Sequence, residues 1–178
     1  MEGRSAGGGK QLEYKYDLIE FMTTLYLMVG LPCSGKTTRA NELENEASAL
    51  RLTPDEWHVN LFGHDIHDPD HDKRHGLIEA MLWQIAARAL SLGTNVILDF
   101  GFWAKEERED FRLRAQKLGA RSEIVFMDVD EEELLKRVRA RNENLTNTVH
   151  YIPEDMMKSW IGFFQKPDMD ELQPREKD

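Results

Sequence analysis

The sequence predicts an α/β domain with a doubly wound parallel sheet, and two observations lead to that fold class. Short apolar runs of the kind found in buried strands alternate with stretches whose apolar residues recur at helical spacing. The motif G-x-x-x-x-G-K-T, at residues 30–37, lies between the first such run and the first helical stretch, which is the context it requires. Ligands of such sheets bind at the carboxyl ends of the strands.

Each element is predicted from local pattern. Strands are expected at residues 24–29, 49–52, 95–99 and 123–128, and helices at residues 36–47, 54–62, 74–92, 105–118, 131–141 and 153–165. Gly93 and Gly119 end two of the helices, because glycine accepts the left-handed conformation that follows a helix. Pro153 suits the first position of the last helix, where its missing N–H has no intrahelical partner to lose.

Length and composition restrict both organisation and partners. The 178 residues suit one domain, expected at residues 22–167, after an extension or tag at residues 1–21 and before a mobile acidic tail at residues 168–178. A net charge of −10 disfavours nucleic acid as a partner. The single cysteine excludes an intrachain disulfide, and no apolar run or leader suggests a membrane. We therefore expect a cytoplasmic protein.

Residues 30–38 carry the residue types that bind the phosphates of a nucleotide. Glycines let successive N–H groups point at phosphate oxygens, and the start of the helix adds partial positive charge. Lys36 is expected to reach the β- and γ-phosphates of ATP, and the Thr37 hydroxyl to bind Mg²⁺. The expected nucleotide-binding residues are Gly30, Cys33, Ser34, Gly35, Lys36, Thr37 and Thr38.

Other motifs narrow the class of P-loop protein. A GTPase usually carries D-x-x-G and N-K-x-D, and neither occurs in this sequence. ABC ATPases and AAA+ machines need a signature loop or an added helical domain, for which this length leaves no room. A small P-loop kinase with a short lid remains.

Three further segments, at residues 52–57, 95–103 and 134–142, support a family assignment. Together with residues 30–37 they resemble the small bacterial P-loop kinases and predicted ATP-binding proteins related to zeta toxins, chloramphenicol phosphotransferase and the 5′-kinase domain of polynucleotide kinase. The resemblance implies transfer of the γ-phosphoryl group of ATP to a hydroxyl group.

The resemblance also implies roles for two carboxylates. Asp55 would take the proton from the acceptor hydroxyl, although it could instead cap the short helix that begins beside it. Asp99 ends a buried strand and would orient Mg²⁺. Related polynucleotide kinases have an arginine three residues after the first aspartate, where this chain has His58.

Arg137 and Arg141 are four residues apart and share one helix face. They precede a polar loop that could close over ATP, and lid arginines at this place in related kinases stabilise charge on the transferring phosphoryl group. The alternative is a solvated helix face paired with neighbouring glutamates.

The acceptor is expected to contact Trp57, His58, Phe102, Trp103 and Arg108. The aromatic residues could equally be core packing, and the arginine could pair on its helix surface. His64, His67, His71 and His75 lie in a polar segment that favours a substrate-side loop over a metal site.

Three functions stay open at this point. The first is a kinase acting on a small hydroxylated molecule such as an antibiotic, a sugar or a nucleotide-sugar. The second is a 5′-hydroxyl polynucleotide kinase. The third is an ATP-binding regulatory or toxin-like protein with little turnover.

Overall fold

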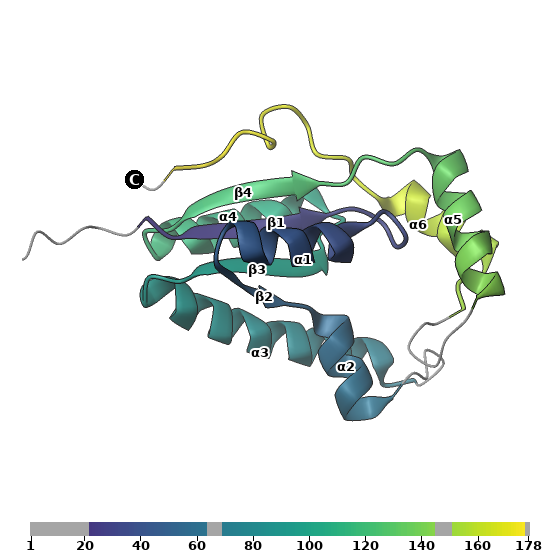
Figure 1. The fold of residues 1–178 in the computed structure, drawn as a ribbon, viewed down its shortest axis with the longest axis horizontal. Coiled ribbons are helices and arrows are strands. Elements are labelled where there is room, and N and C mark those ends of the chain that lie inside the picture. The colour runs from purple at the N-terminus through teal and green to yellow at the C-terminus, as the bar shows by residue number, and fades with distance from the viewer. Residues whose placement is uncertain (1–21, 64–68, 145–150, 177–178) are drawn as a thin grey trace, which may run out of the picture.

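Four parallel strands form one sheet in the computed structural model, which describes residues 22–63, 69–144 and 151–176 (Figure 1). The strand order is β2-β3-β1-β4, so the chain crosses over between neighbouring strands. Leu27 of the inner strand β1 stands opposite Leu98 of β3 and Ile124 of β4. The elements are β1 (Thr24–Val29), α1 (Lys36–Glu46), β2 (Ala49–Leu52), α2 (Pro54–Phe62), α3 (His71–Ser91), β3 (Asn95–Gly101), α4 (Lys105–Lys117), β4 (Arg121–Phe126), α5 (Glu131–Glu143) and α6 (Glu154–Phe163).

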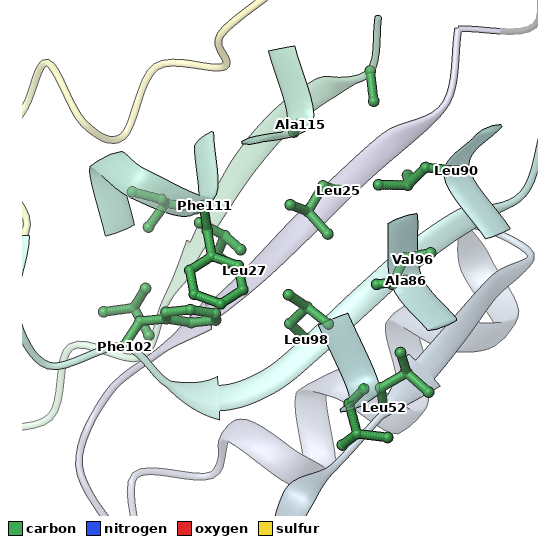
Figure 2. Packing of buried hydrophobic residues seen from close by; sticks show 14 of the residues in the cluster. Leu25, Leu27, Leu52, Ala86, Leu90, Val96, Leu98, Phe102, Phe111 and Ala115 are labelled. Carbon is green, nitrogen blue, oxygen red and sulfur yellow. The ribbon is translucent and has the colours of Figure 1, made fainter. Parts of the chain in front are cut away.

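Helices cover both faces of the sheet (Figure 1), as the nearly continuous apolar run of β1 requires. Leu25 and Leu27 pack with α3 and α4 in the larger core cluster, in which Phe111 of α4 lies over the sheet (Figure 2). Met28 points the other way and packs with Ala40 of α1 in a second cluster. The predicted doubly wound parallel fold is therefore confirmed.

A third apolar cluster lies beyond the carboxyl ends of the strands. Leu31, in the loop after β1, packs there with Leu134 and Val138 of α5 and with Met157 of α6. The cluster fastens α5 beside the loop at residues 30–37. Helices α2 and α5 thus lie on either side of the carboxyl end of the sheet (Figure 1).

Some element bounds differ from the prediction. Helix α3 begins at His71, three residues earlier than expected, so the polar segment before it is shorter. Pro153 is the N-cap of α6 rather than its first residue, and α6 ends at Phe163. The predicted lid loop falls mainly on residues 145–150, outside the described residues. No helix in the described chain combines the length and the apolar character needed to cross a membrane.

The prediction that the acidic tail is mobile is wrong for residues 168–176. This segment runs along β4 (Figure 1), where Arg175 forms a bridge with Ser122. Arg112 donates hydrogen bonds to the carbonyl oxygens of Glu171 and Gln173, both at 2.8 Å. The tail is attached because α4 offers buried arginines that the tail's acceptors satisfy.

The strongest of these attachments is a buried ion pair. Arg108 is fully buried, and its Nε and Nη2 donate to the two carboxylate oxygens of Glu171 at 2.8 and 3.1 Å. Burial alone would raise the pKa of Glu171, but the hydrogen bonds from Arg108 and from the Asp168 backbone outweigh it, so the pKa lies below its ordinary value. The pair locks residues 168–176 onto α4.

Glu171→Gln is expected to destabilise the fold by about 3–5 kcal/mol, because it leaves the buried Arg108 charge uncompensated. Urea unfolding at neutral pH measures the change. Glu176→Gln is the matched control in the same segment, since the Glu176 side chain is 60% exposed and Arg121 keeps its ion pair with Glu123, so the midpoint should stay near that of the wild type. Equal midpoints for the two variants would contradict the structural role of the buried pair.

Candidate functional site

The loop between β1 and α1 is tightly curled. Gly30, Cys33 and Gly35 have φ values of 152°, 63° and 94°, in the region that favours glycine. A Cβ atom at Gly30 would lie 2.8 Å from the Ser34 Oγ and 3.3 Å from the Met127 Cβ, so no side chain fits there. Gly35 is the N-cap of α1. The curl turns the loop backbone around the start of α1, where an anion is favoured.

Lys36 lies within this curl. Its Nζ donates a hydrogen bond to the Leu31 carbonyl oxygen at 3.0 Å. Burial lowers the pKa of the Lys36 ammonium below its ordinary value, and the charges of Asp99 and Asp55 oppose the shift. The ammonium is therefore desolvated and close to two carboxylates, and a phosphate chain would compensate its charge further.

Asp99 and Thr37 form the link between β3 and α1. The Thr37 hydroxyl donates to the Asp99 Oδ2 at 2.8 Å, while the Asp99 Oδ1 is buried and has no hydrogen-bond partner in the described chain. Burial raises the pKa of Asp99 above its ordinary value, and the hydrogen bond from Thr37 and the charge of Lys36 offset only part of this rise. A hydroxyl oxygen and an unpartnered carboxylate oxygen side by side are ligands that suit Mg²⁺.

Arg137 and Arg141 both reach the loop from α5. The Nη1 of Arg137 lies 3.4 Å from the Cys33 carbonyl oxygen, and its Nε donates to Glu133 at 2.8 Å. The Nη1 of Arg141 lies 3.6 Å from the Cys33 Sγ, and its Nε is buried without a partner among the described residues. Arg139 instead pairs with Glu154 of α6. The four-residue spacing thus brings two guanidinium groups to the loop.

Asp55 lies at the second position of α2, after Pro54. The N-cap is Thr53, so the alternative that Asp55 caps this helix is wrong. The Asp55 side chain is 88% exposed, and its Oδ1 lies 4.0 Å from the Nδ1 of His75. The carboxylate is therefore accessible at the carboxyl end of the sheet, and it acts electrostatically on Lys36 across the site.

The predicted acceptor contacts of Phe102 and Arg108 need correction. Phe102 is buried in the main core with Phe111, at a ring distance of 5.0 Å (Figure 2), because the chain turns inward after β3. Arg108 uses its Nη1 to donate to the carbonyl oxygens of Phe102, Trp103 and Gln165, and the rest of its guanidinium to bind Glu171. Neither side chain is available to a substrate.

His58 also lies elsewhere than predicted. It is 5% exposed and packs between α2 and α3, with its ring centroid 4.4 Å from that of His71 and 5.4 Å from that of Phe62. Its place is in a helix contact rather than on the open side of α2. Trp57, by contrast, is exposed on α2, and Trp103 is half-buried against Trp160; their contacts with an acceptor stay predictions.

Of the polar histidine segment, His64 and His67 fall outside the described residues. His71 and His75 lie on the first two turns of α3. Within residues 22–63, 69–144 and 151–176 there is no group of three or more His, Cys, Asp or Glu side chains arranged to hold a metal ion.

A cavity beside the loop is a feature that the sequence did not reveal. Its volume is about 480 Å³, within the range of small-molecule sites. It is lined by Leu31, Ser34, Phe126, Met127, Asp128, Val129, Asp130, Glu131, Leu134, Ile161, Phe164 and Lys166. These residues come from three stretches of the chain, 31–34, 126–134 and 161–166, so only the folded arrangement brings them together.

Comparisons with known proteins agree with this architecture. A family model described as an AAA domain (AAA_33) matches residues 25–167. A search of curated proteins finds no match.

Solved structures resemble the fold at low sequence identity. A chain of the Pnkp1/Rnl/Hen1 RNA repair complex is 23% identical with a TM-score of 0.70, and the alignment covers 91% of this chain and 50% of that one. This chain thus spans about half of that relative. Kti12 of Chaetomium thermophilum, in complex with ADP-AlF3, is 20% identical with a TM-score of 0.59 and 81% of each chain covered. A gluconokinase from Sinorhizobium meliloti is 15% identical with a TM-score of 0.56, covering 85% of this chain and 79% of that one.

Gly30→Ala is expected to weaken nucleotide binding by about tenfold or more. The strain at such a position is of order 1–3 kcal/mol, and ~1.4 kcal/mol corresponds to a factor of ten. Titration of a fluorescent ADP analogue measures the affinity. Gly76→Ala is the control, since a Cβ there meets nothing within 4 Å and affinity should be unchanged. Wild-type affinity in Gly30→Ala would contradict a phosphate-binding role for the loop.

Proposed function

Because the chain belongs to the AAA domain family, whose model matches residues 25–167, we propose that it is an ATP-dependent kinase that transfers the γ-phosphoryl group to a hydroxyl of a small molecule. The observation that carries the proposal is the grouping of Lys36, the Thr37–Asp99 pair and Arg141 around one curled loop. Phosphoryl transfer depends on positioning and on charge stabilisation, and this grouping offers both.

The loop residues would hold the triphosphate. Backbone N–H groups and the N-terminus of α1 bind phosphate oxygens, and Lys36 contacts the β- and γ-phosphates. Thr37 and Asp99 would hold Mg²⁺, which when bound neutralises charge on the β- and γ-phosphate oxygens. The unpartnered Oδ1 of Asp99 supports this assignment.

We assign the nucleoside to the cavity of about 480 Å³ that borders the loop at Leu31 and Ser34. Apolar side chains such as Phe126 and Leu134 suit a base, and carboxylates such as Asp130 are acceptors for amino and hydroxyl groups.

Asp55 would act as the general base. It accepts the proton of the acceptor hydroxyl while that oxygen bonds to the γ-phosphorus, and the bond from the γ-phosphorus to the β–γ bridging oxygen breaks to release ADP. Helix α2, which carries Asp55, lies on the opposite side of the sheet end from α5 (Figure 1), and the exposed Asp55 carboxylate is accessible to an acceptor. Arg137 and Arg141 would stabilise the charge on the transferring group.

A small acceptor is the first choice because the chain carries a net charge of −10 and resembles a gluconokinase in fold. A second candidate is a 5′-hydroxyl polynucleotide, which the likeness to a chain of an RNA repair complex favours. Polynucleotide-stimulated turnover would fall steeply with salt.

An acceptor panel tests the proposal directly. ATP consumption is measured with sugars, sugar acids, aminoglycosides, chloramphenicol, nucleosides and a 5′-hydroxyl oligonucleotide. We expect one class to stimulate turnover and Asp55→Asn to reduce the stimulated rate by about 10²-fold or more, since general bases contribute about 10²–10⁴-fold.

Glu56→Gln is the matched control for that experiment. Glu56 follows Asp55 on α2 but pairs with Arg51, so its loss should leave the stimulated rate nearly unchanged. If ATP binds, no acceptor stimulates, and Asp55→Asn behaves like the wild type, the chain is an ATP-binding regulatory protein rather than a kinase.

Arg141→Ala is expected to lower kcat for the stimulating acceptor by about 10³-fold with a much smaller change in the KM for ATP, because the guanidinium acts mainly on transition-state charge. Steady-state kinetics separate the two constants. Arg139→Ala removes a cation from the same helix that pairs with Glu154, and its kcat should stay close to the wild type. Equal losses in both variants would point to a damaged helix instead.

A further inference from the structure

Beside Asp55, the contact between α2 and α3 holds two titratable groups, His75 and Glu79, that the proposed mechanism does not use. The Nδ1 of His75 lies 4.0 Å from the Asp55 Oδ1, and its Nε2 lies 3.4 Å from the Glu79 Oε1. Glu79 is one helical turn further along α3. Both ring nitrogens of one half-buried histidine therefore face carboxylates.

The chemistry of imidazole decides the state of this histidine. A neutral ring donates from one nitrogen and accepts at the other, so one of the two carboxylates would face a lone pair. The imidazolium carries an N–H on both nitrogens, so it donates to Glu79 and turns a positive N–H toward Asp55, which is 4.0 Å away and therefore an ion-pair rather than a hydrogen-bond partner. Two carboxylates on opposite sides of the ring favour the charged form of His75.

We propose that His75, held as an imidazolium by Glu79, is a positioning residue that keeps the Asp55 carboxylate directed into the site. The inference rests on the proposed kinase function, in which Asp55 is the base. The exposed Asp55 side chain needs such a partner, because a carboxylate that is 88% exposed has few contacts to limit its rotamers.

Other titratable and charged groups surround Asp55, His75 and Glu79, and they include both acids and bases. The groups that face His75, its two carboxylate partners or its ring neighbours are Lys36, His58, His71, Asp72, Arg74, Asp99 and Glu107. The hydrogen bond to Glu79 raises the pKa of His75, burial opposes it, and the charges of Glu79, Asp55 and Asp72 add to the rise. The net direction is upward from the ordinary value.

The sign of the pH effect follows from that direction. Below the raised pKa of His75 the imidazolium is present and Asp55 is held. As the pH rises through that pKa, the ring loses its proton and the hold on Asp55 is lost. Phosphoryl transfer should therefore decline on the alkaline side at a pH set by Glu79.

Proton NMR of the full chain tests the coupling without requiring turnover. The His75 Hε1 resonance, assigned with His75→Asn, is followed against pH in the wild type, in Glu79→Gln and in Asp55→Asn. We expect the pKa of His75 to lie above 6.5 in the wild type and to fall in both variants. The His71 resonance in the same spectra is the internal control, and its dependence on pH should differ less among the three proteins than that of His75.

Kinetics then test the positioning role. With the acceptor found in the panel, Glu79→Gln should lower kcat and move the alkaline limb of the pH profile to lower pH, while the KM for ATP is unchanged. A His75 pKa at or below 6.5 that ignores both substitutions overturns the inference. So does an unmoved pH profile in Glu79→Gln. If the pKa of His75 falls in Glu79→Gln and in Asp55→Asn but no acceptor is phosphorylated, the interaction of His75 with the two carboxylates is supported and only the kinase proposal is overturned.

Discussion

The hydrogen bond between Thr37 and Asp99 is the contact on which the site depends. It joins the end of β3 to the start of α1, and it leaves one buried carboxylate oxygen without a partner. Burying a carboxylate is unfavourable unless other groups compensate its charge. The neighbouring Lys36 and the N-terminus of α1 supply part of that compensation, and the remaining acceptor is what makes the position suited to a divalent cation.

Packing places the other charged groups around that contact. The apolar cluster of Leu31 with α5 and α6 brings Arg137 and Arg141 to the loop. On the opposite side, α2 carries Asp55 and α3 carries His75. Each helix is held by its apolar residues, and this packing does not depend on which charges the other residues of the helix carry. Helix α5 can therefore place guanidinium groups, and α2 a carboxylate, around the same loop without disturbing the sheet.

Two residues that the sequence placed at the acceptor site lie in the interior of the protein instead. Arg108 and Phe102 follow β3 closely and were expected to face an acceptor, yet the chain turns them into the interior. The arginine can be buried there because Glu171, 63 residues further along, and three carbonyl oxygens satisfy its donors. An acidic tail therefore serves as the counter-charge of a core residue, and its composition alone suggested mobility.

The sequence by itself determined the strand and helix order, the phosphate-binding loop and the pair of arginines on one helix face. These features depend on residues close in the chain, where a period of two or 3.6 residues or a fixed motif spacing sets the geometry. Only the tertiary structure decided that Arg108 pairs with Glu171, that a cavity borders the loop, and that His75 lies between Asp55 and Glu79. Those arrangements join segments far apart in the chain, and local pattern carries no information about which distant partner will satisfy a buried charge.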